Sequence, residues 1–154
     1  MSFRVRGLSP DPFRKLFAMN DAELQAIGAR RVVADGDGFP CRVSMAHAKV
    51  GEELILCNYE HQPGHSPYRS NHAIYVARDS REAFDDIDVV PEVMSTRLLS
   101  VRAFDRDHMI VDADVVEGAD AAKLFERLLG NPETEYLHVH NAKRGCYSGR
   151  VERA

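Results

Sequence analysis

Residues 98–129, LLSVRAFDRDHMIVDADVVEGADAAKLFERLL, decide the fold class of this chain. Apolar residues alternate with polar ones over 98–104 and 108–116, on either side of a turn at 105–107, which predicts a β-hairpin. Over 119–129 the apolar residues instead recur every three or four positions, which predicts an amphipathic helix. They are Ala121, Leu124, Phe125, Leu128 and Leu129. A helix directly after a hairpin can cover one face of the sheet.

The rest of the chain predicts further strands with few helices between them. The predicted strands span 3–6, 30–34, 54–59, 72–78, 135–140 and 146–151. Two short helices are expected before residue 28, the second opened by a capping box from Asn20 to Glu23, and another around 81–84. Because strands and helices do not alternate regularly, we expect an α+β fold. It would have a mostly antiparallel sheet, one covering helix at about 119–129 and two short N-terminal helices.

The composition is that of an ordinary globular chain, and we expect one domain over residues 1–154. Apolar residues make up 44% and charged residues 29%, which excludes collagen-like, coiled-coil and largely disordered proteins. The net charge of −4 gives no general electrostatic case for binding nucleic acid or an anionic membrane. No apolar stretch has the length of a signal-peptide core or a membrane span. With three widely spaced cysteines, an odd number, we expect a cytoplasmic protein with free thiols.

Polar residues gather around proline and glycine turns in three clusters, at 38–42, 58–72 and 138–147. Six of the seven histidines lie between residues 47 and 72 or at positions 138 and 140. Loops that carry such side chains on a rigid sheet are where binding sites tend to lie. We therefore expect the functional site at these clusters.

Segments of these clusters resemble a family of bacterial proteins designated domain of unknown function 1203. The segments that carry the resemblance are 3–10, 39–42, 58–63, 67–70, 140–142 with Gly145 and Cys146, and 150–153. The resemblance implies one domain over essentially the whole chain. It implies no activity, cofactor or catalytic residue, so the site must be inferred from the residues themselves.

The first hypothesis is a site for a small anionic molecule, built from the second and third clusters. Guanidinium groups suit carboxylates and phosphates, because their planar fork donates two hydrogen bonds at once. The expected ligand-binding residues are Arg42, Tyr59, Tyr68, Arg69, Ser70, His72 and Asn141. Arg69 has an alternative structural role as the partner of Glu60 or an aspartate, and the tyrosines have one in packing. No cofactor and no nucleic-acid or membrane partner are expected, and the oligomeric state stays open.

Whether this site is catalytic also stays open. His61 or His140 would act as the acid–base group, because only histidine has an unperturbed pKa near neutrality. Cys146 lies two residues from Arg144, and a neighbouring guanidinium can activate a thiol as a nucleophile. The alternative for each cysteine is packing as a small apolar residue.

The second hypothesis is a metal site on His138 and His140. Residues i and i+2 of a strand point to the same face, about 6.6 Å apart, so both rings can reach one metal. Further ligands would come from His61, Glu60, His72 or Cys146. Alternatively, Leu137 and Val139 face the core while both histidines lie on the solvent face. A third hypothesis is a protein-interaction module, for which we expect a flat polar surface.

Overall fold

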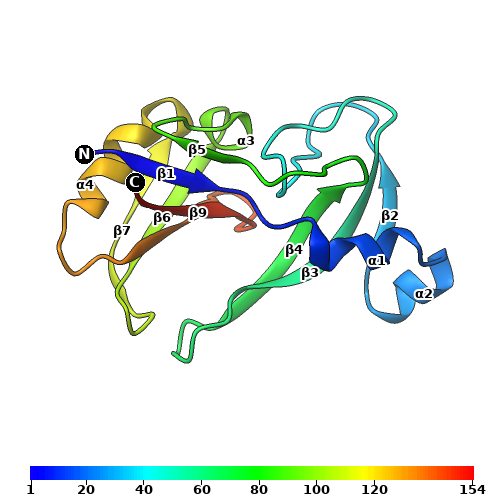
Figure 1. The fold of residues 1–154 in the computed structure, drawn as a ribbon, viewed down its shortest axis with the longest axis horizontal. Helices are drawn as coiled ribbons and strands as arrows, with labels where there is room; N and C mark the ends of the chain where they lie inside the picture. Colours follow the sequence, from blue (N-terminus) through cyan, green and yellow to red (C-terminus); the bar gives the residue numbers. More distant parts are fainter.

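Two antiparallel sheets lie beside one another along the long axis of the molecule in a computed structural model that describes residues 1–154 (Figure 1). Together they contain nine strands, accompanied by four short α-helices. The larger sheet has six strands in the order β5-β1-β9-β8-β6-β7, and the smaller has three in the order β2-β3-β4. No helix is long and apolar enough to cross a membrane.

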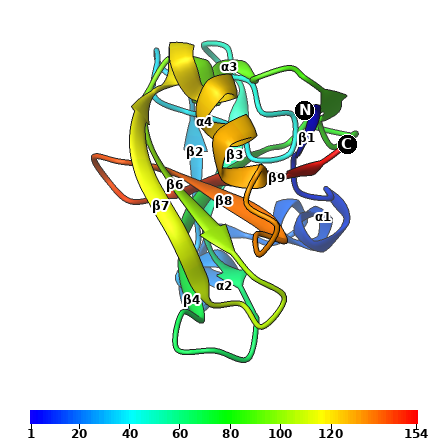
Figure 2. The same cartoon turned by 90° about the vertical axis from the view of Figure 1, so that its left-hand side faces the viewer.

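The larger sheet is built from strands at both ends of the chain. Its strands are β1 (Phe3–Arg6), β5 (Asp85–Ile87), β6 (Leu98–Phe104), β7 (Ile110–Glu117), β8 (Tyr136–Asn141) and β9 (Tyr147–Arg153). Helix α4 (Ala121–Leu129) lies against this sheet, as Figure 2 shows. Its apolar stripe packs with Phe3, Leu137 and Val139 in one buried cluster. The short helix α3 (Glu92–Ser95) adds Val93 and Met94 to the same cluster.

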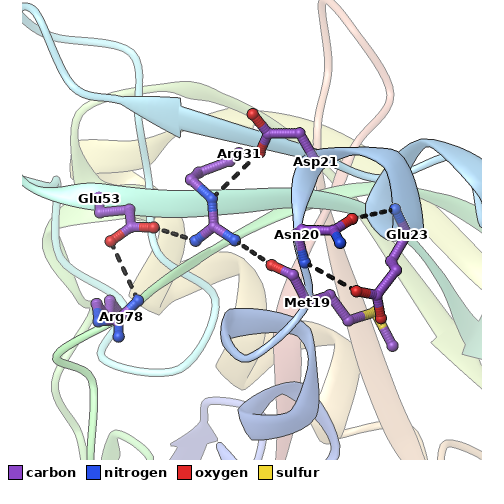
Figure 3. A network of polar contacts seen from close by, with 7 residues as sticks. All are labelled: Met19, Asn20, Asp21, Glu23, Arg31, Glu53 and Arg78. Carbon is purple, nitrogen blue, oxygen red and sulfur yellow. Dashed lines mark hydrogen bonds and ion pairs between the residues drawn. The ribbon is translucent and has the colours of Figure 1, made fainter.

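The smaller sheet comprises β2 (Arg30–Val33), β3 (Glu53–Gln62) and β4 (Ser70–Ala77). It forms a second buried cluster with the N-terminal helices α1 (Arg14–Phe17) and α2 (Asp21–Ala26). Figure 3 shows how polar contacts fix α2 on this sheet. Asn20 caps α2 by accepting from the Glu23 amide at 2.8 Å, and Glu23 reciprocates. Arg31 donates to Glu53 and to the Met19 carbonyl.

The long β3–β4 hairpin reaches across to the larger sheet. Its tip lies beside the β6–β7 turn, where Ser66 Oγ donates to the His108 carbonyl at 2.9 Å. At the end of β3, Gln62 Nε2 donates to the Tyr136 hydroxyl at 2.8 Å. Between the two apolar clusters there is therefore a contact zone built mainly from polar and aromatic side chains.

The prediction of an α+β fold with antiparallel pairing is confirmed, but the strands form two sheets. The prediction of a helix around 81–84 is wrong. Between β4 and α3 the only regular element is the strand β5. Strand β5 instead pairs with β1 at the sheet edge, where Asp85 accepts from Arg4 Nη2 at 2.7 Å.

Candidate functional site

Three histidines meet in the zone between the two sheets. His138 and His140 lie two residues apart on β8, and His61 approaches them from β3. Each histidine can offer one ring nitrogen, and these three nitrogens all lie within 4.8 Å of one another. All three are buried: His61 is 8% exposed, His138 is 3% exposed and His140 is 2% exposed. The structure therefore assembles a buried three-histidine cluster from residues far apart in the sequence.

Two β-bulges lie next to these histidines and affect the direction of their side chains. The β3–β4 register shifts by one residue between Tyr59 and Gln62, and the β8–β9 register shifts between Val139 and His140. A bulge of this kind adds an unpaired residue and redirects neighbouring side chains. At the first bulge, His61 and Gln62 are both buried although they are consecutive. Both bulges therefore lie at the cluster.

Aromatic rings surround the histidines. Tyr147 stacks on His61 with ring centroids 5.1 Å apart and an interplanar angle of 5°. The same ring meets His138 edge-on at 5.2 Å and His140 at 5.7 Å. Phe104 packs edge-on against His138 at 5.1 Å. These contacts restrict ring rotation and shield the cluster from water.

The ring nitrogens are left largely without protein partners. His140 Nδ1 lies 2.9 Å from the Gly145 carbonyl, so it carries the proton and leaves Nε2 with a free lone pair. His61 Nδ1 is buried with no hydrogen-bond partner. No hydrogen bond joins either nitrogen of His138 to another group. Such free nitrogens are unusual, because buried polar atoms are normally paired.

All three imidazoles are neutral at pH 7. Burial, together with the smaller effect of the Arg102 charge, lowers the pKa of His61 to about 4. Burial also lowers the pKa of His140 to about 3, against the opposing effect of the Gly145 carbonyl. For His138, burial and the neighbouring His140 lower the pKa to about 2. Neutral imidazole is the form that binds a metal ion.

A pocket of about 770 Å³ opens near this cluster, and we call it the Arg42 pocket. It is lined by Asp35, Asp37, Gly38, Phe39, Pro40, Arg42, Leu56, His72, Ala73, Tyr75, Arg97, Asn141, Arg144 and Cys146. Strands β3 and β4 contribute one wall, and the segment before β6 and the β8–β9 turn contribute another. The pocket thus lies between the two sheets.

Arg42 is a buried cation in the pocket wall without a carboxylate partner. The residue is 2% exposed, and it forms no ion pair. Its Nε donates to the Tyr147 carbonyl at 2.5 Å and its Nη1 donates to the Pro40 carbonyl at 2.8 Å. Burial lowers the pKa of Arg42 to about 10, so the group still carries its charge at neutral pH.

Two further arginines, Arg97 and Arg144, line the pocket, and neither forms an ion pair or a side-chain hydrogen bond. Asn141 adds a buried Oδ1 atom with no hydrogen-bond partner. Three arginines face two exposed aspartates, so the lining carries a formal charge of 3 − 2 = +1. This positive lining stands out in a chain whose net charge is −4.

The structure places the residues singled out from the sequence in a pocket, in a cluster, or outside both. Arg42, His72, Asn141 and Cys146 share the Arg42 pocket, and His61, His138 and His140 form the histidine cluster. Tyr59 packs between Phe13 and Tyr147. The remaining three, Tyr68, Arg69 and Ser70, lie outside both.

Arg69 does not point into the pocket. Its side chain is 60% exposed and pairs with Glu60, with Nε 3.2 Å from Oε2. This is the structural role given above as its alternative. Tyr68 packs edge-on against Phe104, and Ser70 donates to the Tyr68 carbonyl. The 65–70 loop therefore contributes no side chain to the pocket or the cluster.

The alternative in which His138 and His140 lie on a solvent face is wrong. All six residues of β8 are buried, because α4 covers one face of the strand and β3 approaches the other. Cys146 lines the Arg42 pocket together with His72 and forms no hydrogen bond to a histidine. All three cysteines are free.

Sequence reasoning missed Arg97, Arg102 and Tyr147. Arg97 follows a polar stretch with no regular pattern, and nothing in the sequence separates it from the other arginines of the chain. Arg102 and Tyr147 did carry a signal, because each lies on a predicted strand. Arg102 pairs with His138 across β6 and β8, and Tyr147 pairs with His140 across β8 and β9.

Comparison with curated proteins and with solved structures gave no match. A family model matches residues 38–153, a range that includes the whole histidine cluster and Arg42. The match leaves out the first 37 residues, and with them the segment 3–10 that contributed to the resemblance. The family is described only as a protein of unknown function, so it adds no chemistry to the site. On this match, the chain belongs to the DUF1203 family.

Proposed function

We propose that the protein binds a small organic anion in the Arg42 pocket. One observation carries the proposal: the guanidinium of Arg42 is buried and charged, and only neutral carbonyls contact it. Burying a charge is unfavourable unless a partner of opposite charge offsets the loss of water. An anion in the pocket would supply that partner.

The chemistry of the lining indicates the class of ligand. Arginine binds carboxylate or phosphate with two parallel hydrogen bonds, and such charge-assisted bonds are among the stronger ones in proteins. Arg97 lies close enough to Arg42 to lower its pKa, so both can meet one anionic group. Phe39, Leu56 and Tyr75 provide an apolar wall for the rest of the molecule. A volume of about 770 Å³ suits a metabolite-sized ligand.

The proposal concerns binding, and a reaction at the same place is a separate hypothesis. His72 and Cys146 line the pocket and would be the candidates for acid–base and nucleophilic roles. His61 and His140, the other acid–base candidates, belong to the histidine cluster. A catalytic role for them would require a ligand that extends toward the cluster.

Calorimetric titration with citrate, succinate and inorganic phosphate tests the proposal at constant ionic strength. The protein is first treated with a chelator and desalted, which removes bound metal. We expect at least one anion to bind, and Arg97→Gln to weaken it by roughly 10- to 100-fold, since hydrogen bonds to charged groups contribute about 1.5–3 kcal/mol. Arg97 is the preferred variant, because Arg42 also holds two backbone carbonyls.

Arg106→Gln is the matched control. It removes the same charge from an exposed turn outside the pocket and should leave the affinity unchanged. Arg69→Gln tests whether Arg69 binds the anion, as the sequence had indicated. The proposal is wrong if no anion binds, or if Arg69→Gln weakens binding while Arg97→Gln does not.

A further inference from the structure

The geometry of the histidine cluster points to a second site. We propose that His61, His138 and His140 bind one divalent transition-metal ion, with zinc as the first candidate. The proposal is independent of the anion pocket, because the two sites share no lining residue.

The spacing of the ring nitrogens supports a metal ion rather than direct contacts among the rings. No hydrogen bond connects any two of the three histidines, although their ligand atoms all lie within 4.8 Å of one another. A tetrahedral zinc ion with Zn–N distances of 2.0–2.1 Å holds its nitrogens about 3.3 Å apart. Each ring therefore needs to move inward by less than about 1 Å to reach a common ion.

The hydrogen bonds around the cluster prepare it for this role. His140 donates from Nδ1 to the Gly145 carbonyl, which fixes its tautomer and leaves Nε2 as the ligand atom. Metal-binding histidines typically donate their other ring nitrogen in this way. His61 Nδ1 is buried without a protein partner, and coordination through this ring would place the metal where no protein group donates or accepts. The neutral state of all three rings at pH 7 removes the need to displace protons first.

The ligand set also restricts the kind of metal. Three imidazoles with no carboxylate favour zinc, cobalt, nickel, copper or iron over magnesium and calcium, which prefer oxygen ligands. Structural zinc sites usually have four protein ligands, whereas three leave one position for water or substrate. Three neutral ligands also leave the ion's charge uncompensated, and Arg102 and Arg150 lie close enough to lower the pKa of His138. An anionic fourth ligand, such as hydroxide or a carboxylate, is therefore favoured.

The test is titration of the metal-free, untagged protein with Co²⁺, followed by its visible absorption, with Zn²⁺ added as competitor. We expect one Co²⁺ per chain, an absorption of the intensity typical of four- or five-coordinate cobalt, and its loss on addition of Zn²⁺. His61→Gln and His140→Gln should each weaken Co²⁺ binding by at least about 100-fold, the upper end of the effect of losing an outer-shell partner. His65→Gln, on the exposed hairpin tip, is the matched control and should bind as the wild type does.

A measurement on the wild type keeps the test decisive if a variant fails to fold. In NMR spectra of the imidazole nitrogens, one equivalent of Zn²⁺ should shift the signals of three of the seven histidines. The proposal is overturned if Co²⁺ and Zn²⁺ do not bind, or if His61→Gln and His140→Gln bind both ions normally. It is also overturned if the shifted signals belong to other histidines. Arg97→Gln should leave metal binding intact, so failure of one site is distinguishable from failure of the other.

Discussion

Four buried side chains of the two sites, Arg42 and the three histidines, each have a defined charge at neutral pH. Arg42 keeps its proton, because a pKa of about 10 still lies well above pH 7. His61, His138 and His140 stay neutral, because burial favours the uncharged ring. The Arg42 pocket therefore presents a cation, and the cluster presents three neutral ligands.

Acid should destabilise the metal-free protein. The three histidines have an ordinary pKa near 6.5 when unfolded and lowered values, between about 2 and about 4, when folded. The unfolded state therefore binds more protons as the pH falls below 6.5, and the free energy of unfolding decreases. The slope is up to about 1.4 kcal/mol per pH unit for each histidine. Urea unfolding between pH 7.5 and 5 measures it.

His61→Gln serves as the control for this prediction, because it should make the slope shallower by up to about 1.4 kcal/mol per pH unit. From about one pH unit above 6.5 upward, the histidines contribute almost no slope, because they are then neutral in both states. A free energy of unfolding that stays flat from pH 7.5 to 5 contradicts the description of three buried neutral rings.

The sequence predicted part of the site at this scale. The spacing of His138 and His140 correctly indicated two rings on one face, and His61 was among four candidates for a third ligand. The alternatives could not be separated from the sequence, because the bulge between Tyr59 and Gln62 decides which of the consecutive residues Glu60 and His61 turns inward. The burial of Arg42 could not be predicted from the sequence either, because it depends on hydrogen bonds to the carbonyls of Pro40 and Tyr147.

Among the elements, the β3–β4 hairpin matters most for the site, since it carries His61 to the larger sheet. Its tip is held by a short chain of hydrogen bonds in which Gln62 and His108 both contact the Tyr136 hydroxyl, at 2.8 and 2.7 Å. Gly64 lies under the His108 ring, where an added Cβ would be 2.4 Å from Cγ. Only glycine allows this close approach.

Gly64→Ala should therefore loosen the hairpin tip. The new methyl group would displace the His108 ring from Tyr136, and we expect a loss of about 1–3 kcal/mol in the free energy of unfolding, as for other overpacked positions. Urea denaturation measures it. Gly36→Ala is the control, because nothing lies within 4 Å of the added carbon there. Equal stability of Gly64→Ala and Gly36→Ala would contradict the close packing of the tip.

Element prediction succeeded where a periodic pattern was strong. The hairpin at 98–116 and the helix ending at Leu129 match β6, β7 and α4, because their apolar residues repeat with the period of each structure. Strand β5 was missed for a physical reason. All three of its residues are exposed at a sheet edge, so no inward-facing apolar position marks it.

At the scale of the whole molecule, two apolar cores are joined across a polar contact zone. One core belongs to the larger sheet and α4, and the other to the smaller sheet and the N-terminal helices. The Arg42 pocket takes Leu56 and His72 from the smaller sheet and Asn141 from the larger one. A bound anion would thus contact both halves and stabilise their association.

Anion binding in the Arg42 pocket is tested most directly by urea unfolding of the metal-free protein, followed by circular dichroism, with and without the anion that binds most tightly. At a concentration of about 100 times its dissociation constant, a ligand specific for the folded state adds about 2.7 kcal/mol to the free energy of unfolding. We expect this gain for the wild type and for Arg106→Gln, and only about 0.4–1.4 kcal/mol for Arg97→Gln at the same concentration, because its affinity is 10- to 100-fold lower. An equal gain in all three proteins, or no gain in the wild type, would contradict anion binding in the Arg42 pocket.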